Sequence, residues 1–468
     1  MLFAIAFCTN WQGLRAGPTV HAANHVTDSL QIDKVFIIGN RKTKEFIIRR
    51  ELDVREGMVI SRGSVAKILE QDKNKLINTR LFLTVDINLI ELSDRRADII
   101  VSVNERWYFF PIPIFNLADR NFTEWWVNQN RDLSRIEYGI NLKQYNFRGR
   151  NETLGLLAQF GFTQRFRLSY QIPYINRSQQ FGITFYADYA TNKNISAQTI
   201  EHRLQFVDSP DLLRRRLQFG ANVTYRPSFY SYHQVGAIVS STAVADTILS
   251  INPNYTLNAA RYQQYIGLYY SFTIDRRDYI GYPLSGWFLT AGITQIGIGI
   301  PDDVAITRIN SRFAHFRPLG KKFYFAGNIA GLTSFPGKQP YNLMTGLGYS
   351  FDGMRGFERY VIEGQHYIVN NNSFKRELFK KQYDLGKLMP IRQFRYLPLA
   401  LYLSLNFDHG YVFNYPDYFQ NTRFSDRYLF GGGLGLDLVT SYDSVTRFDF
   451  SFNADGETAF FLNLRVAF

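Results

Sequence analysis

The chain has 468 residues with 41 Phe and 30 Tyr and a formal net charge of +13, yet its mean hydropathy is only −0.20. A high aromatic content with low mean hydropathy is unusual for a cytosolic enzyme and is expected of a transmembrane β-barrel, whose lipid-facing apolar residues alternate with lumen-facing polar ones. No apolar run reaches the roughly 18–20 residues of a membrane-spanning helix, which excludes a helical membrane protein. The basic residues are dispersed, so we expect them in solvated loops or in a barrel-rim patch that faces anionic lipid headgroups, and we expect no nucleic-acid partner.

Residues 1–22 are interpreted as an export signal. The apolar stretch MLFAIAFC begins the chain, and TVHA, which ends at Ala22, offers a small-residue cleavage pattern. Cys8 is the only cysteine, so the processed chain would contain none, which suits an exported protein built without disulfides. One cysteine and seven scattered histidines lack the spacing of a zinc site, and we expect neither a metal nor a cofactor.

Residues 31–105 predict one small α+β domain. IDKVFIIGN is typical of a strand, KEFIIRREL and SVAKILEQDKNKLINTRLF have helical periods, and FLTVDINLIEL and ADIIVSVNE supply two further strands. This β-α-α-β-β order resembles a POTRA domain, the periplasmic module of outer-membrane assembly barrels. The resemblance implies that the edge strand carrying Val85, Ile87 and Leu89 pairs with extended client segments, because main-chain hydrogen bonds give affinity with little demand on client sequence.

Residues 106–132 are predicted to connect this domain to a barrel. They contain WYFFPIPIF, with two prolines, and the adjacent Trp125 and Trp126. The aromatic side chains would anchor the barrel rim in lipid headgroups, and binding of clients is the alternative role.

Residues 133–468 predict an antiparallel transmembrane β-barrel. QFGITFYADYA, YIGLYYSFTID, LALYLSLNFDHG and TRFDFSFNAD each place apolar residues on one face and polar or small residues on the other. At roughly 9–11 residues per strand about 16 strands fit, and 14 is the nearest even number. The predicted fold class is therefore mainly β, a C-terminal barrel preceded by one small α+β domain. Periodicity alone leaves a soluble sandwich open.

The chain ends on an alternating strand. ETAFFLNLRVAF places Leu464, Val466 and the terminal Phe468 on one face. A terminal aromatic on such a strand resembles the recognition signal of outer-membrane barrels.

A Gly-rich loop between two strand-like runs contains FDGMRGFERY, residues 351–360. Its MRGF segment, which is Met354, Arg355, Gly356 and Phe357, resembles the V-R-G-[FY] motif at the tip of the in-folded loop of the BamA/TamA-like outer-membrane protein assembly (bacterial surface antigen) superfamily. NFDHGYVF, LFGGGLGLDL and DRRDYIGYPLSGWFL resemble further barrel segments of that family. The resemblance covers almost the whole chain after residue 30 and implies a short member with a single POTRA domain.

In this family the loop arginine reaches a carboxylate on the inner barrel wall, which suggests that Arg355 pairs with Asp408. Strand parity supports the pair independently, because Asp408 shares its face with Ser404 and Asn406, opposite a stripe of leucines. Asp437 also faces the lumen by parity and is a second candidate acceptor. We expect a bidentate guanidinium–carboxylate pair that holds the loop inside the barrel.

The resemblance implies a bacterial outer-membrane protein, with its POTRA domain in the periplasm, that inserts, folds or translocates client proteins. Client strands would add at a lateral seam between the first barrel strand, near residues 137–146, and the last, residues 458–468. Expected partners are unfolded outer-membrane or secreted proteins, the bilayer, lipopolysaccharide and accessory subunits. The alternatives are a passive pore or transporter, a translocon for one dedicated partner, and an accessory subunit of a larger machine. We expect no enzymatic activity, since G-x-S-x-G and H-E-x-x-H are absent.

Overall fold

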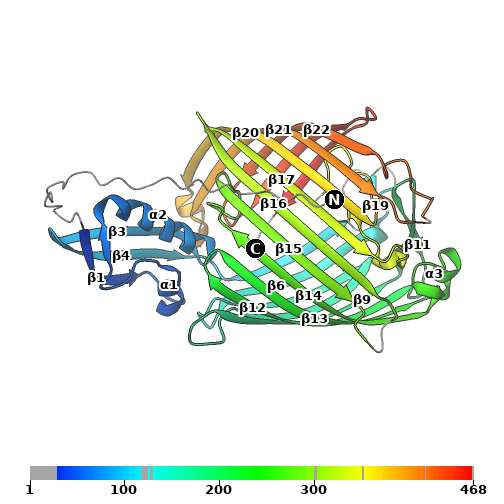
Figure 1. Ribbon diagram of the computed structural model, residues 1–468, viewed down its shortest axis with the longest axis horizontal. Coiled ribbons are helices and arrows are strands. Elements are labelled where there is room, and N and C mark those ends of the chain that lie inside the picture. Colours follow the sequence, from blue (N-terminus) through cyan, green and yellow to red (C-terminus); the bar gives the residue numbers. More distant parts are fainter. Residues whose placement is uncertain are drawn as a thin grey trace, which may run out of the picture.

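The computed structural model describes residues 29–117, 125–126, 130–299, 303–349, 353–389, 391–416 and 418–465. The predicted export signal, Val466 and Phe468 lie outside these residues. Two parts follow one another along the chain, a small N-terminal module of residues 29–105 and a large barrel (Figure 1).

The N-terminal module is a four-stranded sheet with two helices packed on one face. Its elements are β1 (Ser29–Ile38), α1 (Glu45–Glu51), β2 (Val59–Ser61), α2 (Arg62–Asn78), β3 (Phe82–Ser93) and β4 (Arg96–Glu105). The sheet order is β2-β1-β4-β3, with β1 and β4 parallel and the other pairs antiparallel. The predicted α+β domain is confirmed, and the structure adds the short β2, which the sequence did not indicate.

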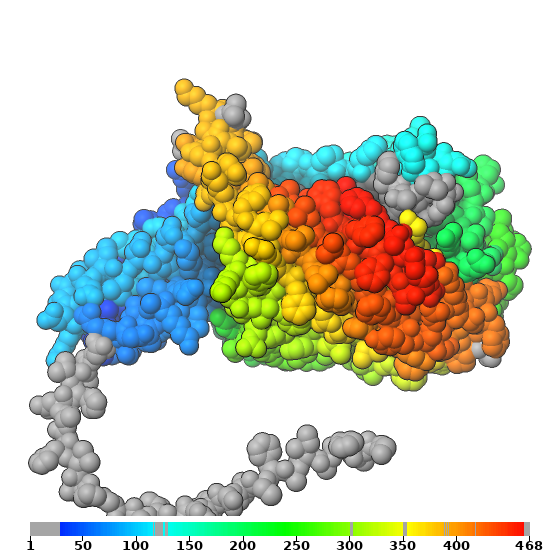
Figure 2. All heavy atoms as spheres, turned by 90° about the horizontal axis from the view of Figure 1, so that it is seen from above, coloured from blue at the N-terminus to red at the C-terminus, as the bar shows by residue number. Residues whose placement is uncertain are grey.

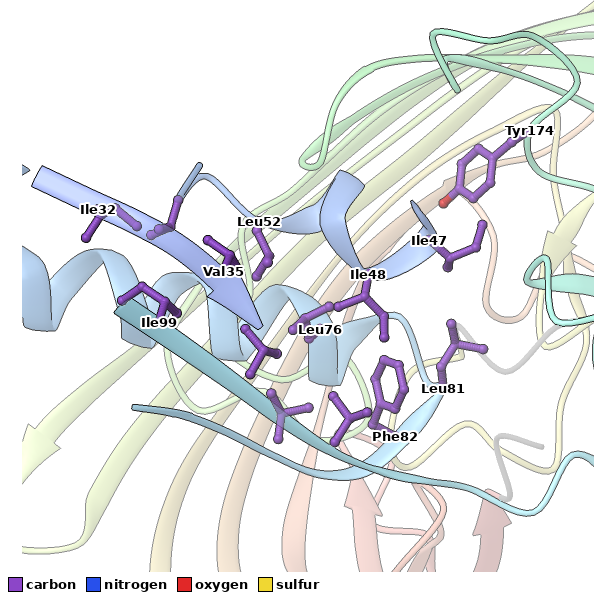
Figure 3. Packing of buried hydrophobic residues seen from close by; sticks show 14 of the residues in the cluster. Ile32, Val35, Ile47, Ile48, Leu52, Leu76, Leu81, Phe82, Ile99 and Tyr174 are labelled. Atoms are coloured by element: carbon purple, nitrogen blue, oxygen red, sulfur yellow. The ribbon is translucent and has the colours of Figure 1, made fainter. Parts of the chain in front are cut away.

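The module folds around one apolar core. Ile48 from α1, Leu76 from α2, Phe82 from β3 and Ile99 from β4 are fully buried together (Figure 3). Burying each such side chain stabilises the fold by about 1.5–3 kcal/mol. Tyr174, from a turn of the barrel, completes the same cluster, so the core continues across the boundary between the two parts.

Within the described residues the barrel is a sixteen-stranded antiparallel sheet, which confirms the predicted strand number. Its strands, in sheet order, are β5 (Phe109–Leu117), β6 (Ile136–Phe147), β7 (Glu152–Gly161), β8 (Thr163–Ile172), β9 (Phe181–Asn192), β12 (Arg214–Ser228), β13 (Ser231–Val244), β14 (Tyr262–Asp275), β15 (Gly286–Ile296), β16 (Ile306–Gly320), β17 (Phe323–Phe335), β20 (His366–Asp384), β21 (Tyr396–Phe413), β22 (Tyr428–Val439), β23 (Val445–Asn453) and β24 (Thr458–Arg465).

The side chains of β21 show how this sheet is oriented. Leu403 and Leu405 point outward and are 43% and 44% exposed, whereas Asn406 and Asp408, on the opposite face, are buried. The same alternation along other strands gives the barrel an apolar outer surface, with exposed Leu, Ile, Phe and Tyr side chains, and a polar interior. A soluble sandwich would bury its apolar faces, so this alternative is wrong.

Smaller elements lie at the end of the barrel farthest from the N-terminal module, which we call the distal end (Figure 1). They are the hairpin of β10 (Asn194–Ile200) and β11 (Arg203–Asp208), helix α3 (Asp246–Ile251), and the paired β18 (Gly346–Leu347) and β19 (Ile362–Glu363). None of the helices in the described part of the chain has both the length and the apolarity to cross a membrane.

The first barrel strand differs from the prediction. β5 lies inside the predicted connector of residues 106–132, and it pairs with β6 as the first strand of the sheet. The strand expected to come first, near residues 137–146, is β6 and is second. Pro111 and Pro113 suggested a connector, but a proline is compatible with an edge strand when its missing N–H faces the unpaired side.

One hairpin on the module side of the barrel is longer than its neighbours. β17 pairs with β20 only as far as Arg376, and β22 pairs with β21 only from Ala400, so residues 377–384 and 396–399 extend past both neighbouring strands. The orange segment in Figure 2 shows this hairpin projecting beside the N-terminal module.

A buried ion pair joins the N-terminal module to the barrel. Arg226, at the end of β12, donates from Nη1 and Nη2 to the two carboxylate oxygens of Glu51 on α1, at 2.7 and 3.0 Å. Arg50 and the Tyr174 hydroxyl also donate to Glu51. Burial opposes ionisation of Glu51, but the Arg226 and Arg50 guanidiniums outweigh it and hold the pKa of this carboxyl below its usual value.

Other contacts between the module and the barrel lie at further turns of the barrel rim. The Asn78 amide, at the end of α2, bonds the backbone of Asp278 and Ile280 in the turn between β14 and β15. Arg106 pairs with Asp443 in the turn between β22 and β23. The module is therefore held against several turns and covers part of this end of the barrel (Figure 2).

Replacing Glu51 with Gln is expected to loosen the module, because it leaves the Arg226 charge buried without a counter-charge, at a cost of about 3–5 kcal/mol. The folded pKa of Glu51 is lowered from 4.5, so its stabilisation is present above pH 4.5 and is lost as the pH falls through the folded pKa. Hydrogen exchange of α1 should therefore rise in Glu51→Gln at neutral pH and in the wild type at acidic pH. Arg55→Gln, at an exposed site on the same module, is the control; unchanged exchange in Glu51→Gln would contradict the docking role.

Candidate functional site

The loop between β17 and β20 folds back into the barrel. Its tip residues Met354 and Phe357 are buried and pack against residues of the barrel wall and of the loop that follows β21. The wall residues of this cluster are Val369 on β20, Val412 on β21 and Leu429 on β22. The predicted MRGF tip therefore lies inside the lumen.

Glycines make room for this tip. A Cβ added at Gly431 on β22 would lie 1.9 Å from the Arg355 carbonyl oxygen, so the strand tolerates no side chain there. Gly356 has a φ of +83°, which favours glycine, and an added Cβ would lie 2.4 Å from the Phe452 carbonyl oxygen. The segment GGGLG, residues 431–435 of β22, therefore leaves space for the loop tip.

Arg355 contacts Asp408 on β21, the carboxylate that the sequence suggested. The Arg355 Nη1 donates to Asp408 Oδ1 at 2.8 Å, and the Arg355 backbone N–H donates to Asp408 Oδ2, also at 2.8 Å. The Asp408 side chain is fully buried and that of Arg355 is 16% exposed. A charge pair this deeply buried holds the loop in place, because either residue without the other would be a buried charge with no counter-charge.

The geometry of the pair differs from the expected guanidinium fork. One carboxylate oxygen accepts from the guanidinium and the other accepts from the loop backbone, so Asp408 binds both the side chain and the main chain of residue 355. The second guanidinium nitrogen, Nη2, lies 3.4 Å from the Ser373 hydroxyl. The Asp408 carboxylate thus holds the backbone of the loop tip in place and also pairs with the charge of the Arg355 guanidinium.

Asp437 does not bind Arg355, and its prediction as a second acceptor is wrong. It accepts from Arg447 Nε at 2.6 Å and from the Tyr282 hydroxyl at 2.7 Å, and the Lys375 ammonium lies 3.8 Å away. Asp437 faces the lumen as expected, but it lies six residues along β22 from Gly431, the neighbour of Asp408. Six residues of strand span about 20 Å, which is too far for one guanidinium to reach both carboxylates.

His202 holds the in-folded loop from the distal side, a role that no sequence pattern indicates. It is fully buried in the turn between β10 and β11, where Nε2 accepts from the Phe424 N–H at 3.0 Å and Nδ1 lies 3.3 Å from the Val361 carbonyl. Its ring also packs on the Phe424 ring, with centroids 4.9 Å apart. Burial lowers the pKa of His202 to about 4.

Glu363 on β19 is the second distal residue that the sequence did not reveal. Its carboxylate accepts from the hydroxyls of Thr199, Tyr349 and Tyr418 at 2.6–2.7 Å. Burial raises the pKa of Glu363 above its usual value. The residue therefore links the in-folded loop to the β10–β11 hairpin and to the loop after β21.

Strand β3 lies at the edge of the module sheet, as predicted, and pairs only with β4 among the described strands. The three side chains predicted for this edge face the module core instead. Val85 is buried, and Ile87 and Leu89 are half-buried against the module core. Among the described strands, the outer backbone edge of β3 is unpaired.

The last strand, β24, lies at the far end of the barrel sheet from β5. Leu464 pairs with Thr446 on β23, in line with its predicted place on the final strand. Within the described residues of β5 and β24, no hydrogen-bonded pairing joins these two strands. They therefore form the two sides of the seam of the barrel.

Comparisons with known proteins agree with this architecture. Residues 146–373 match the model of the Omp85 superfamily domain, and residues 30–106 match a POTRA model described as the surface antigen variable number repeat. The chain belongs to the Omp85 superfamily. Membership implies an outer-membrane β-barrel with its POTRA domain in the periplasm, so the module end of the barrel is its periplasmic end.

Two solved structures share the fold. One is BamA from Haemophilus ducreyi lacking POTRA domains 1–3, with 16% identity, a TM-score of 0.52, and coverage of 93% of this chain and 84% of that chain. The other is CdiB from Escherichia coli, with 11% identity, a TM-score of 0.56, and coverage of 94% of this chain and 76% of that chain. A search of the curated proteins gave no match.

Asp408→Ala is expected to release the loop tip more completely than Arg355→Lys, because alanine removes both contacts and lysine keeps the backbone one. Arg355→Ala leaves the Asp408 carboxylate buried without its counter-charge and should weaken the free energy of loop docking by about 3–5 kcal/mol. Protease cleavage within residues 353–361 of the purified barrel measures release. Arg359→Ala, which alters an exposed arginine of the same loop, is the control. Equal cleavage of all variants and the wild type would show that the pair does not hold the loop.

Acidification is expected to loosen the loop through His202. Because the folded pKa of about 4 lies below the ordinary 6.5, the neutral ring stabilises the fold fully above pH 6.5, and about 3 kcal/mol is lost by pH 4. Loop cleavage measured from pH 7 to pH 5 should rise in the wild type. His202→Gln, which can still accept and donate a hydrogen bond, should show a flatter profile. His315→Gln, at an exposed histidine on β16, should behave as the wild type.

Proposed function

We propose that this protein inserts or translocates client polypeptides at the outer membrane by pairing their strands at the seam between β5 and β24. One observation carries the proposal: these end strands of the sixteen-stranded sheet each present an edge that pairs with no other described strand. An unpaired backbone group costs several kcal/mol in hydrocarbon, so such an edge favours the addition of a client strand.

The position of the N-terminal module supports delivery of clients to this seam. β4 ends at Glu105 and β5 begins at Phe109, so three residues join the module sheet to the first seam strand. The outer edge of β3, next to β4, offers backbone hydrogen bonds that any extended segment can use. A client held there would lie beside the periplasmic end of the barrel.

The in-folded loop supports the same function from the other side of the seam. Asn453 on β23 donates from Nδ2 to the Gly356 carbonyl, and the Tyr360 hydroxyl bonds Glu457, which immediately precedes β24. The loop thus braces the last strands from within while Asp408 holds its tip. Because the loop packs across the lumen, this arrangement favours strand insertion or guided translocation over a permanently open pore.

Locking the seam is expected to abolish function. Cysteine pairs that combine Phe115 on β5 with Phe460 or Leu462 on β24 can be built in a Cys8→Ser background, which has no other cysteine. Oxidation should block assembly of client barrels in reconstituted vesicles, and reduction should restore it. A control pair, Ala221→Cys with Ala237→Cys, joins directly paired residues of β12 and β13 and should have no effect. Full activity of the protein with its seam locked would refute the proposal that client strands pair at the seam.

Depletion of the protein, followed by a census of outer-membrane proteins, distinguishes the forms of this function. Loss of many barrel proteins is expected for an insertase, and loss of a single exported protein is expected for a dedicated translocon. An unchanged census would contradict the proposal and favour a pore or an accessory subunit.

A further inference from the structure

The hairpin of β20 and β21 that extends past its neighbouring strands, which we call the projecting hairpin (residues 376–399), is basic. It contains six Lys and Arg against two Asp and Glu, a net charge of +4. Both acidic side chains already have basic partners, Glu377 in the Lys322 ammonium and Asp384 in the Arg395 guanidinium. Three exposed lysines supply most of the remaining positive charge: Lys380, Lys381 and Lys387.

One face of the projecting hairpin continues the lipid-facing wall of the barrel. Along β21 the outward-pointing Leu403 is followed on the same face by Leu401, Leu399 and Leu397, because side chains alternate between the two faces of a strand. Leu397 and Leu399 lie past the last residue that pairs with β22. The apolar surface that contacts lipid on the barrel therefore runs without a break onto the hairpin.

The register of β20 against β21 completes the two faces. Phe379, Lys381 and Tyr383 pair with the three leucines and share their face, whereas Gln382 and Asp384 lie on the opposite, polar face. The Lys381 ammonium lies 5.1 Å from the centroid of the Tyr383 ring, and its long aliphatic stem can lie along an apolar surface while its charge reaches a polar one. The projecting hairpin is therefore amphipathic, and its apolar face carries a cation.

The direction of the projecting hairpin places its apolar face over the bilayer. Figure 2 shows the hairpin extending sideways past the barrel wall at the periplasmic end, beside the N-terminal module. A strand pair that leaves the wall in this direction turns its outer face toward the membrane and its inner face toward the periplasm. The face that carries Phe379, Tyr383 and Leu397 therefore lies over the periplasmic leaflet.

A two-stranded ribbon of this kind needs a surface to pack on, because an isolated hairpin is only marginally stable in water. Past Arg376, the described part of β20 pairs with β21 alone. The turn of the hairpin touches the barrel through Phe394, whose ring packs on the Tyr442 ring with centroids 4.8 Å apart. This contact leaves the apolar face uncovered, with Phe379 and Tyr383 38% and 40% exposed.

We infer that the projecting hairpin is a membrane-surface anchor, whose apolar face enters the headgroup region of the periplasmic leaflet and whose lysines bind the phosphates of anionic phospholipids. Apolar burial and charge attraction act together at such an interface, and each lysine near anionic lipid strengthens binding roughly fivefold. Tyr383 suits the boundary between headgroups and acyl chains. An acidic polypeptide would satisfy the lysines but not a face that continues the lipid-facing wall. The inference concerns the bilayer around the barrel and does not depend on the proposed function.

Fluorescence quenching by lipid measures which face enters the membrane. The full-length protein with Cys8→Ser receives one fluorophore, at Tyr383→Cys on the apolar face or at Gln382→Cys on the opposite face. It is placed in nanodiscs of phosphatidylcholine alone or of an equal mixture with phosphatidylglycerol, each with brominated acyl chains that quench on contact. In the mixed nanodiscs, quenching should be roughly tenfold stronger at position 383 than at position 382, and at position 383 it should be weaker in phosphatidylcholine alone.

Removing the lysine charges tests the cause. The triple variant Lys380→Gln, Lys381→Gln and Lys387→Gln should lower quenching at position 383 in the mixed nanodiscs to its level in phosphatidylcholine alone. Heat-modifiable electrophoresis reports which molecules are folded. The matched control removes three exposed lysines elsewhere on the molecule and should leave the quenching unchanged: Lys34→Gln, Lys67→Gln and Lys193→Gln.

Three results would overturn the inference: equal quenching at the two positions, equal quenching at position 383 in the two kinds of nanodisc, or undiminished quenching in the triple variant of the hairpin. A label at position 383 that stays unquenched in both nanodiscs would also overturn it, and would leave this face to an acidic polypeptide. The proposed function stands under each of these results, because none of them concerns the seam.

Discussion

Every backbone N–H and C=O that crosses a bilayer must find a partner within the protein, and the rest of this structure follows from that constraint. The barrel meets it by pairing each of its inner fourteen strands on both sides. Only β5 and β24 keep an edge without a described partner. The described strands therefore leave backbone groups unpaired only along one seam. The roles of the module and of the in-folded loop follow from where each lies relative to that seam.

The interior of the barrel holds its parts by charge rather than by apolar packing alone. The Asp408 carboxylate, fully buried, accepts from both the side chain and the main chain of Arg355. An apolar cluster around Met354 and Phe357 packs the loop tip against the barrel wall beside that contact. A buried charge is costly unless its partner is present, so the loop has one strongly preferred position.

The Glu51–Arg226 pair applies the same chemistry at the periplasmic rim. It joins α1 of the module to β12, which stands well away from the seam in the order of the sheet. The polypeptide link from β4 to β5 holds the other side of the module next to the seam. The open edge of β3 is thus kept near the barrel without being covered by it, an arrangement suited to handing over an extended segment.

Alternation and helical period are properties of single segments, so the sequence alone predicts the barrel, the module, about sixteen strands and the lumen-facing parity of Asp408 and Asp437. Only the folded chain shows that Asp437 binds Arg447, that β5 belongs to the barrel despite its prolines, and that Val85 faces the module core. It also brought His202 to Val361 and Phe424, which lie 159 and 222 residues away in the chain. Such contacts have no local signature, because closure of the barrel, and not the neighbouring sequence, sets which walls and loops meet.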